Sequence, residues 1–163
     1  MSFSPRASAT QAELIGRCLQ VAQHTATAGD VPVGAVVVSN NGELLGEGFN
    51  TRERDADPTG HAELNALRQA ASTRGTWRLE GCTLAVTLEP CPMCAGAITQ
   101  SRIGTVIFGA WDEKAGAAGS VFDILREPRL NHWVEVHPGV RAQECADQLR
   151  RFFEQFRADP TQG

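Results

Sequence analysis

The chain has 163 residues, of which 42% are hydrophobic, and a net charge of -4 at neutral pH. This length and composition are typical of one domain, which we expect to span residues 1–163 with loose ends at 1–9 and 159–163. The acidic balance disfavours broad, sequence-independent binding to nucleic acid, which requires a basic surface, but it permits a small local contact with a folded RNA.

The first part of the chain predicts a helix followed by a hairpin. Apolar residues recur at helical spacing from Gln11 to about Ala26. β-Branched residues then indicate a strand over Val33–Ser39. Asn40-Asn41-Gly42 is typical of a tight turn, because Asn and Gly tolerate positive φ, and it leads into an antiparallel strand over Glu43–Phe49.

A second helix is predicted from Asp57-Pro58 to about Ser72, because Asp is a favourable N-cap and Pro is tolerated in the first turn. His61 and Glu63 lie two residues apart, which places them about 200° apart around a regular helix. They can share one site only if His61 lies in the first turn, where the site faces the end of the helix.

The second half of the chain predicts three strands, two helices and a short apolar turn or helix. In chain order these are a strand over Thr83–Leu88, a helix over Pro92–Ser101, a strand over Thr105–Phe108, the short segment Val121–Leu125, a strand over Trp133–Val136 and a helix over Arg141–Arg157. The whole pattern predicts an α/β fold, a three-layer αβα sandwich around a five-stranded mixed sheet.

Two short motifs carry the chemistry, Pro90-Cys91-Pro92-Met93-Cys94 and His61-Ala62-Glu63. The two cysteines and the distant histidine can supply three ligands to zinc; structural sites have four protein ligands, whereas catalytic sites keep one position for water. No obvious fourth ligand accompanies the three, and the Glu63 carboxyl suits proton transfer beside a metal-activated water, which is hydrolytic chemistry. A structural zinc site and a thioredoxin-like cysteine pair remain the alternatives.

The other three cysteines are Cys18, Cys82 and Cys145. In a reducing compartment these are most simply small apolar fillers of the core. Cys82 is excluded as a fourth ligand if the strand after it is real, because six extended residues place it roughly 20 Å from Cys91. No apolar run is long enough to cross a membrane, and residues 1–9 contain no apolar stretch typical of a signal peptide, so we expect a cytoplasmic protein.

An H-x-E motif followed by P-C-x-x-C is the signature of the zinc-dependent nucleobase deaminases. From about Glu13 to Arg157 the chain resembles the TadA family of bacterial transfer-RNA adenosine deaminases, within the cytidine deaminase-like superfamily. Besides the zinc motif, the resemblance rests on Val31–Val36, Gly46–Asn50, Asp57–Thr59, Thr87–Cys91, Ser101–Gly104, Phe108–Ala110 and Gly116–Ser120.

The resemblance implies hydrolytic deamination of adenosine to inosine at the wobble position of an arginine tRNA. It implies a homodimer with one zinc ion per subunit, held by His61, Cys91 and Cys94. It also implies that water activated by the zinc attacks C6 of the base, with Glu63 as the proton shuttle.

The resemblance further implies a set of contacts with the anticodon stem-loop. These would come from Asn50, the backbone of Ala62, Asp112, Lys114, Phe153 and Arg157. Simpler interpretations stand beside them: Asn50 could only terminate a strand, Asp112 could only cap a loop, and Phe152 and Phe156 could only pack in the core. Three residues depart from the family pattern: Trp111 stands in place of an arginine, Gly60 in place of an alanine, and Asn65 in place of an apolar residue.

Two other functions fit parts of the same sequence. A deaminase of free bases or nucleosides, such as guanine or cytosine, would share the zinc chemistry, but it would not need the Gly116–Ser120 loop or a helix bearing Phe153 and Arg157. A zinc-stabilised RNA-binding module without catalysis would have no use for a carboxyl group at Glu63.

Overall fold

The computed structural model describes residues 9–158. Within that range no helix is both long and apolar enough to cross a membrane. The predicted loose ends lie outside the described residues, except for Ala9, which is exposed and belongs to no helix or strand.

Five strands form one mixed sheet in the order β2-β1-β3-β4-β5. Their bounds are β1 Gly34–Val38, β2 Leu44–Phe49, β3 Thr83–Leu88, β4 Thr105–Ala110 and β5 Glu135–His137. β1 is antiparallel to both of its neighbours, whereas β3, β4 and β5 are parallel to one another. The predicted five-stranded mixed sheet is therefore confirmed.

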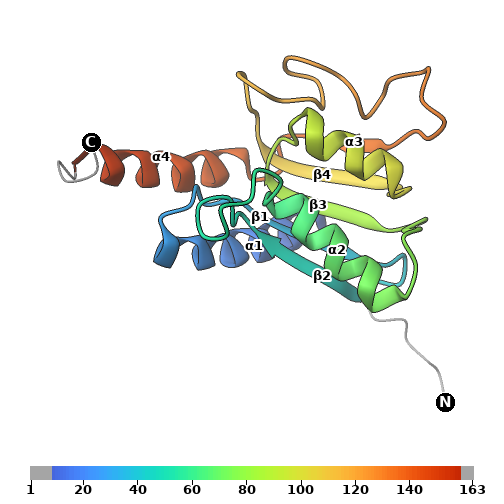
Figure 1. Cartoon of the computed structure of the whole chain (residues 1–163). Coiled ribbons are helices and arrows are strands. Elements are labelled where there is room, and N and C mark those ends of the chain that lie inside the picture. The colour runs from blue at the N-terminus through green and yellow to red at the C-terminus, as the bar shows by residue number, and fades with distance from the viewer. Residues whose placement is uncertain (1–8, 159–163) are drawn as a thin grey trace.

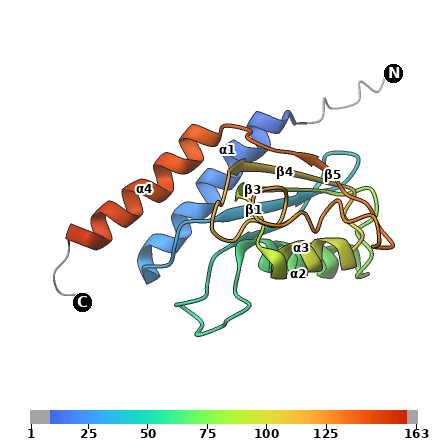
Figure 2. The same cartoon turned by 90° about the horizontal axis from the view of Figure 1, so that it is seen from above.

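Helices cover both faces of this sheet, which confirms the three-layer αβα arrangement (Figure 2). One face carries α1 (Gln11–Ala22), which continues as the 3-10 helix η1 (Gln23–Ala28), together with α4 (Ala142–Ala158). The other face carries α2 (Ala62–Arg74) and α3 (Pro92–Gln100).

Alternating side chains of the central strands supply two separate cores. Leu84, Val86 and Phe108 lie in the core under α2 and α3, whereas Ala85 and Ile107 lie in the core under α1 and α4. All five are at most 3% exposed. Because successive strand residues point to opposite faces, strands covered on both sides are apolar at most positions.

Two segments of the second half bear on the sequence prediction. Of the turn or helix predicted for Val121–Leu125, the helix is absent; the segment contains a bend and the start of a turn, and Asp123 forms an isolated antiparallel bridge with Ala118. The last strand begins at Glu135 and not at Trp133, whose side chain is 70% exposed. Because the Trp133 side chain has no buried contact surface at this edge of the sheet, the strand does not extend to it.

The C-terminal half of α4 continues past the sheet, on the side where the loop after β2 lies (Figure 1). Phe152 is therefore only half-buried and Phe156 is 49% exposed. The interpretation of both residues as core is wrong, because no strand lies beneath this part of the helix.

Candidate metal centre and active site

The metal-ligand motifs lie at one edge of the sheet, where β2, β3 and β4 all end. β2 and β3 are each antiparallel to β1, so they run in the same direction, and β4 is parallel to β3. The helices that follow β2 and β3 therefore both begin at this edge. Carboxyl ends of strands in open α/β sheets are the usual position of ligand sites.

α2 begins later than the sequence predicts. Asp57 does not cap it: its Oδ1 accepts hydrogen bonds from the backbone nitrogen and the hydroxyl of Thr59, at 2.9 and 2.8 Å, which closes a local turn. His61 has extended backbone angles and is the N-cap, so the first helical residue is Ala62. His61 and Glu63 nevertheless share the N-terminal end of the helix, as the shared site requires.

α3 begins as predicted, with Cys91 as its N-cap and Pro92 in its first turn. Cys94 follows in the same turn. Because backbone N–H groups and the helix dipole are positive at this end, the position stabilises thiolates, which are the form that binds zinc.

The three predicted metal ligands converge. His61 Nδ1 lies 3.6 Å from Cys91 Sγ and 3.4 Å from Cys94 Sγ. The three donor atoms all lie within 4.8 Å of one another, and no fourth histidine, cysteine or acidic residue between residues 9 and 158 completes the group. A set of three protein ligands is typical of catalytic zinc rather than structural zinc.

The chemistry of these thiols fits a divalent cation. A hydrogen bond from Cys94 and the neighbouring His61 lower the pKa of Cys91 to about 4. The same contact with the Cys91 sulfur, together with burial, raises the pKa of Cys94. Two adjacent thiolates repel each other unless a cation lies between them, so this donor set suits zinc.

Glu63 is almost completely buried, with 5% of its surface exposed. Burial raises its pKa to about 7, and Cys91 and His61 are close enough to influence it. A carboxyl group that exchanges its proton near neutral pH is suited to general acid–base work.

A cavity of about 240 Å³ adjoins the metal site. We call it the inner cavity; its walls include Val33, Asn50, Arg52, His61, Glu63 and Asp112. Ala62, Glu89, Cys91 and Ala115 also line it. Two metal ligands and the buried carboxyl group therefore face the same space.

Two predicted RNA-contact residues line the inner cavity but also serve their own loops. The Asn50 side chain donates to Val31 O at 3.2 Å and accepts from Arg52 N at 3.1 Å. Asp112 Oδ1 accepts from the backbone of Lys114 and Ala115, at 3.1 and 3.2 Å. The simpler interpretation of Asp112 as a loop cap is thus observed. Each side chain keeps further hydrogen-bonding capacity toward the cavity.

Of the remaining predicted contacts, Ala62 also lines the inner cavity, whereas the other three lie outside it. Lys114 is exposed on the loop after β4, and Arg157 is exposed near the end of α4. Phe153 is 43% exposed and lines a second space of about 640 Å³, which we call the outer cavity.

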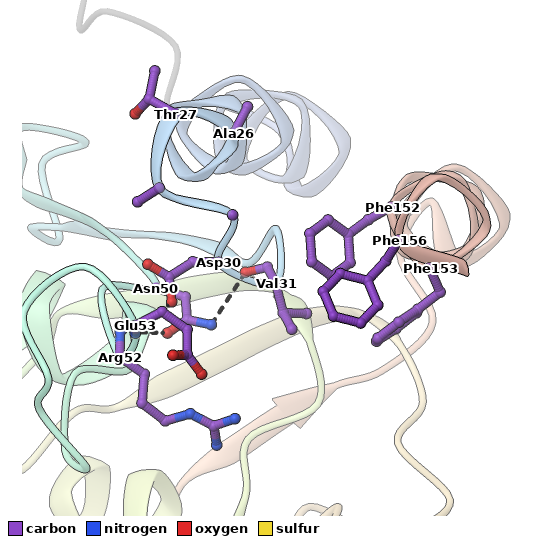
Figure 3. A pocket seen from close by; sticks show the side chains of 12 residues that line it. Ala26, Thr27, Asp30, Val31, Asn50, Arg52, Glu53, Phe152, Phe153 and Phe156 are labelled. Atoms are coloured by element: carbon purple, nitrogen blue, oxygen red, sulfur yellow. Dashed lines mark hydrogen bonds between the residues drawn. The ribbon is translucent and has the colours of Figure 1, made fainter. Parts of the chain in front are cut away.

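The outer cavity lies between α4 and the loops that follow η1 and β2. Phe152, Phe153 and Phe156 form one wall, and Figure 3 shows them facing Val31 and Asn50. Val31, Asn50 and Arg52 line both cavities, so the two spaces are adjacent.

Sequence reasoning missed Arg52 and Glu89, which both line the inner cavity. The Arg52 guanidinium makes no ion pair with another residue in the described range. Glu89 is 2% exposed. Its signal in the sequence is a charged residue immediately after a mainly apolar, buried strand.

Asn65 and Trp111, two of the departures from the family pattern, have different outcomes. Asn65 Nδ2 donates to Phe49 O at 2.9 Å and to Thr51 Oγ1 at 3.1 Å, so it ties α2 to the end of β2. Trp111 packs edge-on against Phe108, with ring centroids 5.0 Å apart, and remains 46% exposed.

Comparisons with known proteins agree with this geometry. The family model described as "Cytidine and deoxycytidylate deaminase zinc-binding region" matches residues 8–110. A tRNA-specific adenosine deaminase of Bacillus subtilis (strain 168) is 46% identical over 91% of this chain and 92% of its own length. A Deinococcus radiodurans protein named tRNA(Ile)-lysidine synthase is 50% identical over 88% of this chain, which spans only 24% of that protein.

A solved structure gives the same result for the fold. It comes from biochemical and structural studies of A-to-I editing by tRNA:A34 deaminases at the wobble position of transfer RNA. It superposes with a TM-score of 0.79 at 35% identity and covers 83% of this chain and 98% of its own.

Proposed function

The chain belongs to the tRNA-specific adenosine deaminases, within the cytidine and deoxycytidylate deaminase family, and we propose that it converts adenosine to inosine in tRNA. We place the edited nucleotide at the wobble position of an arginine tRNA. We further propose that the chain is a single deaminase domain and that the enzyme acts in the cytoplasm. The observation that carries the proposal is a buried carboxyl group beside three metal ligands, in a cavity that adjoins a second, aromatic one.

His61, Cys91 and Cys94 are the residues that would hold the metal. Zinc, when bound, supplies a Lewis acid that lowers the pKa of water from 15.7 to about 7. The net reaction breaks the bond from C6 to the exocyclic nitrogen, forms a bond from C6 to the oxygen of water, and releases ammonia.

Glu63 is the group placed to move the protons of this reaction. Its carboxylate would accept a proton from water and deliver it to the ring nitrogen next to C6, which makes that carbon more electrophilic. The same carboxyl group would later protonate the departing amine. Its burial supports this role, because a shuttle excluded from bulk solvent exchanges protons with the substrate.

The inner cavity would receive a single nucleoside. A stacked base cannot present C6 to the metal site, so the nucleotide must be splayed out of its strand. Asn50 and the backbone of Ala62 would contact this nucleoside, and Asp112 and Lys114 would contact the adjoining RNA. Three of these four residues line the cavity, and Lys114 is exposed beside it.

The outer cavity would bind the RNA next to that nucleotide. Exposed aromatic rings and a neighbouring cation are typical of single-stranded nucleic-acid sites, where bases stack on the rings and cations pair with phosphates. Phe153 and Arg157 on α4 would supply such contacts. Trp111, with an exposed ring next to Asp112 of the inner cavity, would offer a further stacking surface.

A homodimer is proposed with the exposed groove between α2 and α3 as its interface. This groove is lined mainly by apolar side chains, including Leu64, Leu67, Leu79 and Trp77. Trp77 is 55% exposed, which makes it a suitable central contact.

The test is incubation with an anticodon stem-loop that carries adenosine at the wobble position, followed by detection of inosine. Free adenosine, guanine and cytosine should be incubated in parallel, with Glu63→Ala as the inactive control. We expect inosine only in the stem-loop. Turnover of a free base or nucleoside with an unmodified stem-loop would instead support the small-molecule deaminase.

A further inference from the structure

The Glu89 carboxylate, which has no counter-ion among residues 9–158, is buried next to the segment that carries Cys91 and Cys94. Glu89 follows β3 directly, two residues before Cys91, and is 2% exposed. No lysine, arginine or histidine of the described range forms an ion pair with it. Such a group is costly unless hydrogen bonds satisfy its oxygens, so its partners indicate its purpose.

Among the residues that the structure describes, all partners of the Glu89 carboxylate come from one loop, residues 112–120. Its Oε1 accepts a hydrogen bond from Asp112 N at 3.0 Å, and its Oε2 accepts from Ala118 N at 3.0 Å and Ser120 N at 3.1 Å. The Ser120 hydroxyl donates to Oε1 as well. The loop therefore depends on a single side chain for three backbone hydrogen bonds.

The loop is also shaped around this carboxylate. A Cβ added to Gly116 would lie 2.3 Å from Glu89 Cδ and Oε1, so only glycine leaves room for the group. Next to it, Ala117 N donates to Pro90 O at 2.7 Å. The loop is thus attached to the short segment that joins β3 to the metal-binding helix.

This attachment determines the shape of the inner cavity. Asp112 and Ala115, both on the loop, form part of the wall that His61 and Glu63 also line. Because Glu89 immediately precedes the metal-binding motif, its hydrogen bonds fix the position of the loop relative to the metal ligands.

We propose that Glu89 is a positioning residue. It holds loop 112–120 against the segment that carries Cys91 and Cys94, so that Asp112 faces the substrate. It acts through the loop and moves no proton itself. The consequence for RNA binding rests on the proposed function, whereas the consequence for the loop does not. Loosening the loop should weaken substrate binding and leave the chemical step nearly unchanged.

The informative variant is Glu89→Gln. A glutamine keeps the size of the side chain but replaces one acceptor oxygen by a donor NH₂. If its remaining oxygen serves Ala118 and Ser120, the NH₂ group faces the Asp112 N–H, and two donors oppose each other. We expect amide hydrogen exchange at Asp112 to become about tenfold faster or more, since a lost buried hydrogen bond costs about 1–3 kcal/mol.

In activity assays, Glu89→Gln should raise KM for the stem-loop about tenfold while kcat stays within about threefold. Zinc content should stay at that of the wild type. Gly116→Ala should produce the same pattern from the opposite side of the contact, because its methyl group displaces the carboxylate.

Asp30→Asn is the matched control. Asp30 is 1% exposed and holds the other loop of the site, accepting from Glu53 N at 2.7 Å and Arg54 N at 3.1 Å. Its variant should accelerate exchange at those two amides and leave loop 112–120 protected.

Unchanged exchange at Asp112 in Glu89→Gln, or a fall in kcat at constant KM, would overturn the positioning role. If Glu89→Gln does not fold, Ser120→Ala removes a single donor and should still accelerate exchange in the loop; no acceleration there would also overturn it. The exchange measurements need no substrate, so a wild type inactive on the stem-loop would refute the proposed function alone.

Discussion

Replacing Gly48 by alanine should displace the catalytic end of α2. A Cβ at this position would lie 2.4 Å from both Ala62 O and Ala66 N, whereas ordinary contact begins at 3.4 Å. Both atoms belong to the helix backbone, so neither can rotate away. The first turn of α2 must then retreat by about 1 Å, because the close-packed interior offers no other space.

This shift acts directly on the site, because His61 and Glu63 belong to the same end of α2. A misplacement of about 1 Å can cost about 10²-fold in rate, so we expect kcat/KM to fall by about that factor. Overpacking of this kind also costs about 1–3 kcal/mol of stability. For a chain of this size, Tm should fall by about 2–4 °C for each kcal/mol lost.

Gly46→Ala provides a matched control on the same strand and helix. Its Cβ would lie 2.5 Å from Ala66 O and 2.7 Å from Ala70 N, one turn further along α2. It should lower Tm by a similar amount but reduce kcat/KM much less. Inosine formation, thermal unfolding and zinc content should be measured on both variants. Equal losses of activity at equal Tm would refute the argument, as would wild-type activity in Gly48→Ala.

The other predictions concern the metal, the proton shuttle and RNA binding. Glu63→Ala should retain one zinc ion per chain and lose about 10²- to 10⁴-fold in kcat; full activity would exclude a shuttle role. His61→Ala should lose zinc and unfold at a lower temperature, because metal binding is coupled to folding, and unchanged zinc by metal analysis would contradict this. Arg52→Ala should lower the slope of log Kd against log salt for the stem-loop by about 0.7, which is one phosphate contact on single-stranded RNA. Arg54→Ala is its control, since the Arg54 guanidinium is paired with Asp55 at 2.9 Å, and equal slopes in the two variants would remove Arg52 from the RNA site.

The order of the elements and the metal ligands could be predicted because they depend on local rules. β-Branched runs such as Val36–Val38 form strands wherever both faces are covered. Cys91 and Cys94 lie in one helical turn, so their spacing alone brings both sulfurs to the helix start. The predicted strand Thr83–Leu88 excluded Cys82 as a ligand, and the metal cluster of the structure indeed lacks it.

The start of α2 could not be predicted in the same way, because two local interactions compete for Asp57. As an N-cap its carboxylate would accept from the helix, but in the structure it accepts from Thr59 and closes a turn. Thr51 N donates to Gly60 O at 2.8 Å, which ties the end of this turn back to the loop. That contact is tertiary, and no pattern of neighbouring residues encodes it.

Sequence reasoning misplaced Phe152 and Phe156 of α4 and missed Glu89, for opposite reasons. Phe152 and Phe156 have the spacing of a buried helix face, but the sheet ends before they are reached, so the same pattern lines a cavity. Glu89 is charged and would ordinarily be assigned to the surface, yet it is buried because a distant loop supplies its donors. In both cases the missing information is the position of a segment far away in the sequence.

The topology explains why the α2 side of the site is the more sensitive one. α3 follows β3 after only Glu89, Pro90 and Cys91, so this short connection fixes the two cysteines relative to the central strands. α2 follows β2 through the long loop 50–61, which by itself leaves the position of His61 free. That position is therefore determined by packing, through the Asn65 hydrogen bonds to the end of β2 and the close approach of the helix to Gly48. A mutation in this packing moves His61 and Glu63 relative to the cysteines, whereas the cysteines themselves can move only with the sheet.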